Sequence, residues 1–282
     1  MGTRSRMLVV VVVALVAALA WLISGVATID LLGKERLLPL WWVAGGAIPG
    51  VALVYLVRIA VADDPRLAAG SLRALAFGGA VAIALAAPLN GLLIPDGSGL
   101  WWVGLTEESS KLAAALLFSI GVGRSARSGL VIGAAVGAGF AIWENAGYVF
   151  GVYSSAGSAS ASVLLAVQRD LVGLPLHVLF AGFVACAVFR AVQRPSAGRV
   201  VVAVVVFLAV ATTHSLYDLA QLLLPSVDIL GVALTDWLAG LLVLLLVAAW
   251  VVVLRGLRRA RALPRAQPLP SSGPLAPGSA GH

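Results

Sequence analysis

The sequence has little charge and few of the residues that face water in soluble proteins. Only 11% of its 282 residues are charged, 61% are hydrophobic, and the mean hydropathy is +1.05. Soluble domains have about a quarter of their residues charged, so this chain cannot build an ordinary water-facing surface. The shortage of charge excludes a soluble globular protein and predicts an all-α polytopic membrane protein, whose backbone is satisfied by helices within the bilayer.

Lysine and cysteine are also scarce. Lys34 and Lys111 are the two lysines, and the other 17 basic residues are Arg. A single cysteine, Cys186, excludes an intrachain disulfide, and its apolar surroundings are typical of a small buried hydrophobe. Much Ala, Val and Arg beside little Lys indicates a GC-rich bacterial genome and hence a bacterial plasma membrane.

The net charge of +7 could indicate a nucleic-acid-binding protein, but its distribution argues against one. The basic residues form short groups between apolar runs instead of lining one folded face. We therefore expect no nucleic-acid partner and regard the lipid bilayer as the surroundings of the chain.

Eight runs are apolar enough and close enough to 20 residues to span a bilayer. They cover 7–27, 40–61, 73–94, 101–123, 129–150, 171–193, 200–223 and 234–254. The first could instead be a cleaved signal peptide, because Arg4 and Arg6 precede it and Gly25-Val26-Ala27 resembles a cleavage site. Its apolar core is longer than that of a usual signal peptide, which favours an uncleaved anchor.

The positions of the basic residues support eight spans with both termini in the cytoplasm. With the N-terminus inside, 15 of the 19 basic residues fall on inner segments, whereas Lys34, Arg36 and Arg169 fall outside and Lys111 lies within a span. We predict a membrane domain over residues 1–262 and a disordered cytoplasmic tail over 263–282, rich in Pro, Gly, Ser and Ala. Residues 154–162, all small or polar, predict an outer loop.

The fourth span carries three charged residues, although each charge within a span costs roughly 2.5–3.5 kcal/mol on insertion scales. Lys111 follows Glu107 by four residues and Glu108 by three, so on a helix it can pair with either carboxylate. Two carboxylates with one ammonium leave one negative charge poorly compensated, which suits a general base. The alternative is an interfacial helix end with solvated charges, but strongly apolar sequence follows Lys111 directly.

The fifth span combines a glycine repeat with a glutamate. Gly129, Gly133 and Gly137 recur every four residues, a pattern that lets membrane helices approach closely. Glu144 lies seven residues beyond Gly137 and so shares that face, with Asn145 beside it. We therefore expect Glu144 to point into the bundle and not toward lipid.

Two histidines lie within later spans. His177 is preceded by Arg169 and Asp170 at the outer edge of the sixth span, and His214 of the seventh span is one helical turn before Asp218. That spacing lets Asp218 orient the imidazole or accept its proton. A single intramembrane histidine could alternatively form only a helix–helix hydrogen bond.

The polar residues of these four spans lie at one predicted depth. Counted from the outer ends of their spans, Glu107, Glu144 and His177 lie about six residues deep and His214 nine. At ~1.5 Å per residue this is about 9–14 Å below the outer surface. A shared depth on four helices predicts one site, toward the extracytoplasmic side.

Such a set suits activation of water and stabilisation of an oxyanion, and it could also bind zinc, which accepts His and carboxylate ligands. The sequence has no His-Glu-x-x-His motif, no Gly-x-Ser-x-Gly elbow and no Gly-x-Gly-Asp pair. These absences argue against zincins, serine hydrolases and presenilin-type aspartyl proteases.

The ordered set of motifs resembles the PrsW family of intramembrane proteases, related to the CAAX prenyl endopeptidase and bacteriocin-immunity (Abi/CPBP) group. The resemblance rests on four motifs along about residues 60–225, with Pro65 and Arg169 also within it. They are Glu107-Glu108-x-x-Lys111, Phe140-x-x-x-Glu144-Asn145, the isolated His177, and His214-x-x-x-Asp218. The first two spans and the tail carry none of it.

The resemblance implies hydrolysis of a peptide bond in a single-span membrane protein, such as an anti-sigma factor, near the extracytoplasmic face. It implies that Glu107 and Glu108 supply the base, and that His177 and His214 stabilise the oxyanion or bind a metal together with one of these carboxylates. Glu144 and Asn145 would complete the polar surroundings, with Lys111, Asp218 and Arg169 in support. Zinc and a metal-free glutamate mechanism both remain open.

Other classes of protein keep similar residues in the membrane. A proton-coupled transporter or ion carrier would use the same Glu, His and Lys residues, but it would more often show internal repeats or broken helices near the midplane. An inactive relative or a scaffold is the remaining alternative. A scaffold would not need three glutamates and two histidines at one depth.

Overall fold

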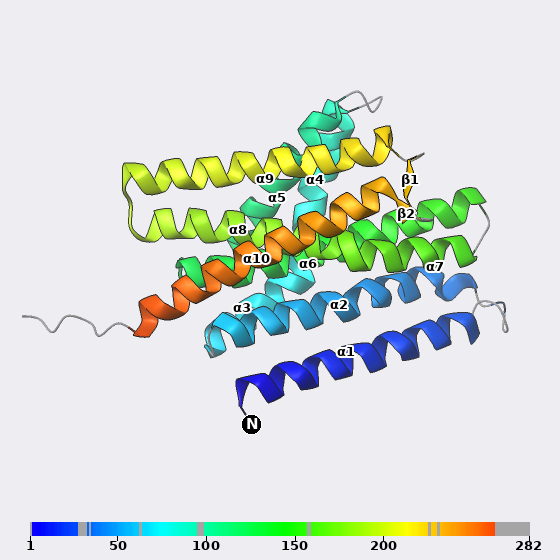
Figure 1. Ribbon diagram of the computed structural model, residues 1–282, viewed down its shortest axis with the longest axis horizontal. Helices are drawn as coiled ribbons and strands as arrows, with labels where there is room; N and C mark the ends of the chain where they lie inside the picture. Colours follow the sequence, from blue (N-terminus) through cyan, green and yellow to red (C-terminus); the bar gives the residue numbers. More distant parts are fainter. Residues whose placement is uncertain are drawn as a thin grey trace, which may run out of the picture.

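The computed structural model describes residues 2–27, 33, 35–61, 64–94, 99–156, 159–224, 227–229 and 232–262. These residues form a bundle of α-helices (Figure 1), as the composition predicted. In the described part the β structure is one antiparallel pair of two-residue strands, β1 (Asp228–Ile229) and β2 (Val232–Ala233). The predicted tail, 263–282, lies outside the described residues.

Ten α-helices are described, some continued by short 3₁₀ or π segments. In chain order they are α1 (Thr3–Val26); η2 (Glu35–Leu37) with α2 (Leu38–Val61); α3 (Pro65–Arg73), η3 (Ala74–Gly78) and α4 (Gly79–Leu93); η4 (Leu100–Trp102) with α5 (Val103–Phe118); α6 (Ala126–Ala156); α7 (Ala159–Gln168), η5 (Arg169–Gly173) and α8 (Leu174–Gln193); α9 (Ala197–Leu223); and α10 (Leu234–Ala262).

Seven described helical segments are long and apolar enough to cross a membrane, and they correspond to seven of the eight predicted spans. The predicted fourth span corresponds to α5, which has only 16 residues and carries Glu107, Glu108 and Lys111. The burial of both glutamates and the lysine shows that α5 nonetheless lies inside the bundle. Its end at Phe118 comes before the predicted boundary at 123, since the positive-φ residues Gly121 and Gly123 follow in a turn.

Predicted boundaries of the third, fifth and sixth spans are also wrong. The third span begins at Pro65 instead of 73, because Asp64 caps the helix by accepting a hydrogen bond from the Arg66 backbone amide (2.9 Å) and Pro65 suits the first turn. The predicted loop at 154–162 is largely helical, since α6 continues to Ala156 and α7 starts at Ala159. Alanine and serine, which read as a small-residue loop, are also compatible with a helix.

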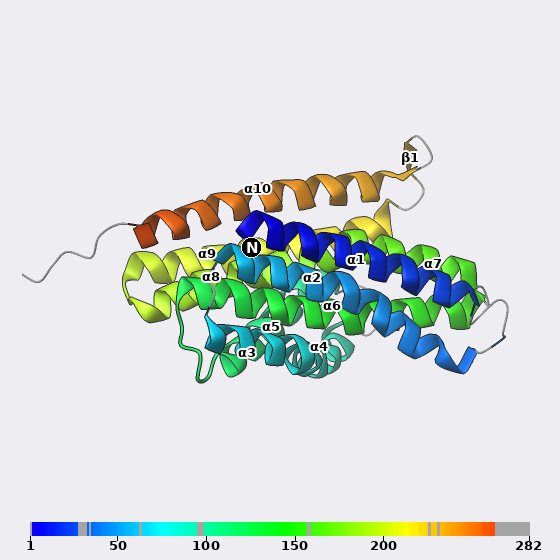
Figure 2. The ribbon, with the colours of Figure 1, turned by 90° about the horizontal axis from the view of Figure 1, so that it is seen from below.

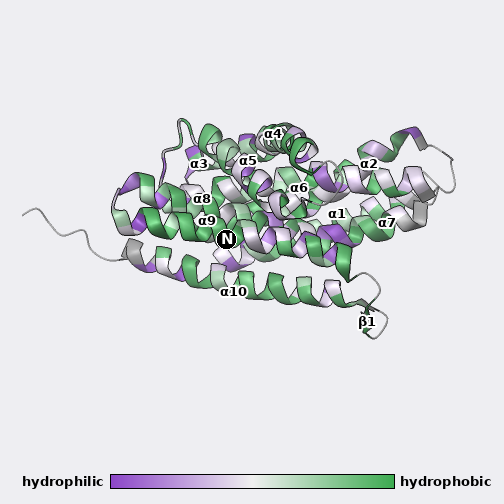
Figure 3. Ribbon diagram, turned by 90° about the horizontal axis from the view of Figure 1, so that it is seen from above, coloured by the Kyte–Doolittle hydropathy of each residue, from purple (hydrophilic) through white to green (hydrophobic). Residues whose placement is uncertain are grey.

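Helix α6 is the centre of the bundle, and every residue from Ser128 to Ile142 is buried. Figures 1 and 2 show it surrounded by the other helices, with α10 on one outer face and α3 and α4 on another. Figure 3 shows mostly hydrophobic residues along α9 and α10, as expected for helices in contact with lipid. The start of α1 and the end of α10 lie on the same side of the bundle (Figure 1), which agrees with an even number of crossings.

The predicted glycine face of α6 packs directly against α8. A Cβ atom added to Gly129, Gly133 or Gly137 would overlap the backbone carbonyl oxygen of Ala185, Ala181 or His177, respectively. The contacts step by four residues on both helices, so the two backbones run close together with only small alanine side chains beside the contact. This contact fixes His177 beside the face of α6 that carries Glu144.

Helices α5 and α9 approach in the same way. A Cβ on Gly104 would overlap the Ala211 carbonyl oxygen, and the Gly104 amide donates to Ser215 Oγ (3.0 Å). Ser215 in turn donates to the Trp101 carbonyl oxygen (2.8 Å). Because Gly104 lies one turn before Glu107 and Ser215 follows His214, this contact sets Glu107 and Glu108 beside His214.

Helix α1 is attached to the bundle through α2. Trp21 and Trp41 stack with ring centroids 4.3 Å apart, and each indole donates to the other residue's carbonyl oxygen (2.7 and 2.8 Å). Elsewhere on the outside of the bundle, Trp250 of α10 covers Gly182 of α8 and donates to the Leu179 carbonyl oxygen (3.3 Å). Both helices are therefore peripheral to α5, α6, α8 and α9.

We expect Gly133→Ala to destabilise the bundle, because the new methyl group would overlap the α8 backbone. The expected cost is roughly 1–3 kcal/mol, as for overpacked cores, visible as a lower Tm of the purified protein in detergent. Gly147→Ala is the matched control, since nothing lies within 4 Å of a Cβ there. Equal Tm values for the two variants would show that the α6–α8 contact is looser than described.

Candidate functional site

All nine predicted site residues meet at one place, contributed by five elements. Helix α5 supplies Glu107, Glu108 and Lys111; α6 supplies Glu144 and Asn145; η5 supplies Arg169; α8 supplies His177; and α9 supplies His214 and Asp218. Glu107, Glu108, Lys111, Asn145, His177 and His214 are buried, and the other three are partly buried. The predicted convergence of four spans is thus present.

The ammonium of Lys111 lies at the centre of the cluster. It donates to Glu108 Oε1 (2.9 Å) and Glu107 Oε2 (3.3 Å), as the helical spacing predicted, and also contacts His177 Nδ1 (2.8 Å). It lies 4.0 Å from the centroid of the Phe140 ring, a cation–π contact. Three acceptors therefore match the three hydrogens of the ammonium.

His177 is held by both of its ring nitrogens. Nε2 lies 2.9 Å from Glu144 Oε2, while Nδ1 faces Lys111. Because an ammonium can only donate, Nδ1 must accept, and Nε2–H then donates to Glu144. The predicted inward direction of Glu144 accounts for this contact.

His214 is held mainly by Glu108. Its Nδ1 lies 2.9 Å from Glu108 Oε1, which fixes Nδ1–H as the donor and leaves the lone pair on Nε2. Nε2 lies 3.6 Å from Glu107 Oε2 and 3.7 Å from Asp218 Oδ2. Asp218 is therefore near the imidazole, as predicted, but Glu108 is its closer carboxylate partner.

A second layer of contacts surrounds Glu144. Arg169 donates from Nη2 to Glu144 Oε2 (2.7 Å) and from Nε to Asn145 Oδ1 (2.8 Å), and Asn145 Nδ2 donates to Asp170 Oδ1 (3.0 Å). The guanidinium also lies over the Tyr148 ring, 3.9 Å from its centroid. Sequence reasoning missed Tyr148, although it is one turn after Glu144 on the same face.

A residue outside the predicted motifs contacts Glu107. Asn90 of α4 donates from Nδ2 to Glu107 Oε1 (3.3 Å), and its Oδ1 accepts a hydrogen bond from Thr106. An amide within an apolar run was the available signal, but nothing in the sequence connects Asn90 to a helix that starts at Val103. The contact arises because α4 and α5 pack against each other.

Glu107, His177 and His214 together fit a metal ion. One ligand atom from each can be chosen so that all three lie within 4.8 Å of one another, and all three residues are buried. Imidazole nitrogens and a carboxylate oxygen are ligands that zinc accepts. Each histidine also has a carboxylate on the ring nitrogen that faces away from this group, the arrangement that orients metal-binding histidines.

Glu108 has one oxygen that no described group satisfies. Oε1 accepts from both Lys111 and His214, whereas Oε2 is buried and has no hydrogen-bond partner among the described residues. A buried acceptor without a partner is costly unless it has a function or binds water. Glu108 Oε2 is therefore the carboxylate oxygen that is free to accept a proton.

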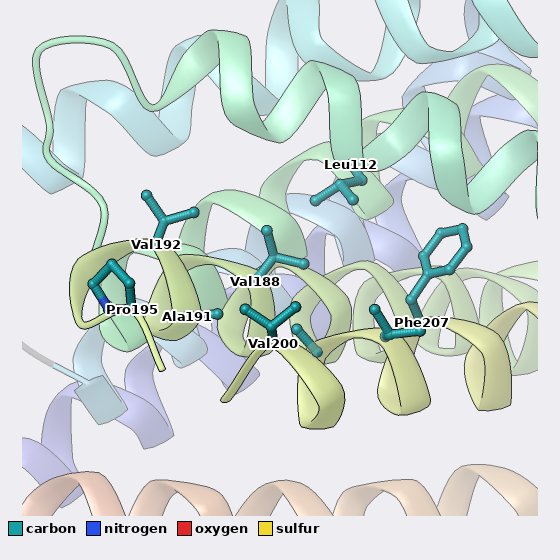
Figure 4. A pocket seen from close by; sticks show the side chains of 9 residues that line it. Leu112, Val188, Ala191, Val192, Pro195, Val200 and Phe207 are labelled. Carbon is teal, nitrogen blue, oxygen red and sulfur yellow. The ribbon is translucent and has the colours of Figure 1, made fainter. Parts of the chain in front are cut away.

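An apolar groove of about 550 Å³ lies elsewhere, between α8 and α9 (Figure 4). Its lining includes Leu112 of α5, Val188 and Pro195 on the α8 side, and Val200 and Phe207 of α9. None of the nine predicted residues lines it, so the groove and the polar cluster are separate features.

We expect Arg169→Met to destabilise the protein, because Glu144 would lose its guanidinium partner in a partly buried place. A cost of roughly 1–3 kcal/mol is expected for leaving a buried polar group unpaired, measured as a lower Tm in detergent. Arg169→Lys should recover only part of it, because lysine cannot donate in the same two-pronged geometry. Arg194→Met, an exposed position between α8 and α9, is the control, and a Tm loss as large there would contradict the assignment.

The comparisons with known proteins agree with this geometry. The family model described as PrsW family intramembrane metalloprotease matches residues 38–254, more than three quarters of the chain. The match begins at α2 and reaches into α10, so the expectation that the second span lies outside the resemblance is wrong, whereas α1 does lie outside it. No curated protein and no solved structure gives a significant match. The chain therefore belongs to the PrsW family of intramembrane metalloproteases, and it is an integral membrane protein and a peptide hydrolase.

Proposed function

We propose that this protein cleaves a membrane-anchored substrate with a single span, such as an anti-sigma factor, near the extracytoplasmic face of a bacterial plasma membrane. The observation that carries the proposal is the buried group of Glu107, His177 and His214, with ligand atoms within 4.8 Å of one another on three helices. Membership of a metalloprotease family supports the interpretation of this group as the catalytic metal site.

Zinc is the metal we propose for this site. Glu107, His177 and His214 would hold it, the two histidines through the nitrogens that do not face Glu144 or Glu108. When bound, zinc supplies Lewis acidity toward a peptide carbonyl and toward water. Three protein ligands are the number typical of catalytic zinc sites.

Glu108 is the general base in this proposal. It lies next to Glu107 in the chain, shares Lys111 with Glu107, and keeps Oε2 without a partner. This oxygen would accept a proton from the water that attacks the peptide carbonyl carbon and would then pass it to the leaving amine. Asp218, which is more exposed than the histidines, would lie at the edge of the site, 3.7 Å from the metal-facing Nε2 of His214.

The residues around Glu144 would keep the site in shape. Arg169 and Asn145 hold Glu144, and Glu144 holds the imidazole of His177 through Nε2. Restricting the imidazole in this way fixes which nitrogen faces the metal. Arg169, Asn145 and Glu144 are thus proposed as positioning residues, and Lys111 as the cation that balances the carboxylates.

The orientation is proposed from the distribution of arginine. The inner segments assigned by the positive-inside rule include the start of α1, the α8–α9 connection and the end of α10, and these lie on one side of the bundle (Figure 1). The site lies toward the other side along α5, where Glu107 is four residues from the first residue of the helix. Along α6 it is deeper, because Glu144 lies 12 residues before Ala156.

The order of the motifs also supports kinship with the CAAX prenyl endopeptidase and Abi/CPBP group. Paired glutamates, a further polar helix and two histidine-bearing helices follow one another in this chain and converge in space. The proposed kinship with that group concerns the common arrangement of the polar helices. It does not alter the roles assigned to the residues.

Cleavage of a generic single-span substrate by the purified protein in liposomes should depend on the cluster. Glu107→Gln, Glu108→Gln and His177→Ala are each expected to lower kcat/KM at least about 100-fold, as removal of a general base or a metal ligand does. Asp236→Asn on α10 is the matched carboxylate control and should keep activity. If no form cleaves any of several substrates while the liposomes show proton flux, the hypothesis of a proton-coupled transporter replaces the proposed protease function.

Removal of metal should abolish cleavage reversibly. The wild-type protein is expected to contain about one zinc per chain, measured by elemental analysis, and to lose activity with a chelator and regain it with added zinc. His214→Ala should contain little zinc. Full activity in metal-depleted protein would instead favour the metal-free glutamate mechanism.

A further inference from the structure

Lys111 and the proposed metal require the same atoms. The ammonium contacts Glu107 Oε2 (3.3 Å) and His177 Nδ1 (2.8 Å), and Glu107 and His177 are two of the three residues in the candidate ligand group. A lysine that merely balanced the charge of two carboxylates would not need to contact the imidazole as well.

The nitrogen that Lys111 contacts is the one a metal would need. Nε2 of His177 is engaged by Glu144, so Nδ1 carries the lone pair that could bind a metal. An imidazole nitrogen has one lone pair, which cannot accept from an ammonium and bind a metal together. A divalent ion and an ammonium a few ångströms apart, in surroundings of low dielectric constant, would also repel each other strongly.

We propose that Lys111 is a built-in competitor of the catalytic metal: its ammonium holds the ligand side chains together, must leave His177 Nδ1 before metal can bind, and thereby weakens metal binding. This inference rests on the proposed function, because it takes Glu107, His177 and His214 as the ligands. It assigns Lys111 as a positioning residue and not as a catalytic one.

The structure offers the ammonium a place to remain after it leaves His177. Its contact with Glu108 Oε1 (2.9 Å) involves neither proposed metal-facing atom, and the Phe140 ring lies beside it. The four-carbon side chain is flexible enough to keep Glu108 while giving up Glu107 and His177. Only two of its three hydrogen bonds must therefore break.

The contacts of Lys111 also explain how the proposed metal ligands stay close together within the membrane when no metal is bound. Glu107 and Glu108 are both buried within one turn of α5, and two unpaired carboxylates there would repel each other and the apolar surroundings. Lys111 bridges them to His177 across two helices. The same contacts that preserve the site would then limit its affinity for metal.

The test is a zinc titration of the full-length, metal-depleted protein in detergent against a chromophoric chelator. Lys111→Met, which keeps the length of the side chain without the charge, is expected to bind zinc at least tenfold more tightly than wild type. Its Tm without zinc should be lower, and the rise in Tm on adding zinc should be larger. Leu112→Met, the next residue but on the side of α5 that lines the groove, is the control and should match wild type.

A charge-balanced pair separates competition from simple electrostatics and guards against a misfolded single variant. Glu108→Gln with Lys111→Met removes one anion and one cation, so the net charge of the site stays that of wild type. Competition predicts that this double variant, despite its unchanged net charge, still binds zinc at least fivefold more tightly than wild type. Equal or weaker binding in both Lys111→Met proteins would overturn the proposal.

The outcomes distinguish this proposal from the proposed function. If wild type and both Lys111→Met proteins bind zinc equally, Lys111 is not a competitor, while the metal site itself stands. If none of the three binds zinc, this inference fails along with the metal assignment, and substrate cleavage by the same wild-type preparation then decides whether the protease assignment remains.

Discussion

The structure depends on neutralising charge where water is absent. Glu107, Glu108 and Lys111 lie on a short helix inside the bundle, and burying such charges is tolerable only when they are paired and hydrogen-bonded. Helix α5 alone supplies two of the contacts of Lys111; the third comes from His177 on α8, and Glu108 also needs His214 on α9. The charges therefore require the helices to meet, and the polar cluster lies in the buried interior where they do so.

Close backbone contact makes that meeting possible. Gly137 touches the carbonyl of His177 itself, and Gly104 touches Ala211 one turn before His214. Both histidines therefore sit on helices whose distance from the carboxylate-bearing helices is set by glycine and not by bulky side chains. Side chains as short as Glu and His can reach each other across such contacts, and α1, α2 and α10 then cover the outside.

Much of this organisation could be predicted from the residues, and the errors have common causes. Apolar runs and arginine positions located the spans, and helical spacing placed Lys111 beside its glutamates and Glu144 on the glycine face. Span ends were misjudged where capping by Asp64 lengthened a helix or where Ala and Ser continued one. Asn90 and Tyr148 were missed because neither belongs to a motif, and the partner of Asn90 lies on another helix.

The sequence by itself determined that the chain is an all-α membrane protein, which helices carry the polar residues, and the motif order of its family. Contacts within one helix follow from spacing, because residues three or four apart share a face. Tertiary structure alone decided that Glu108, more closely than Asp218, contacts His214, that Lys111 reaches His177, and that Glu107 joins the two histidines. Those choices depend on how far each helix is rotated and shifted against its neighbours, which is set by packing such as that of Gly104 and Gly137 and not by the local sequence.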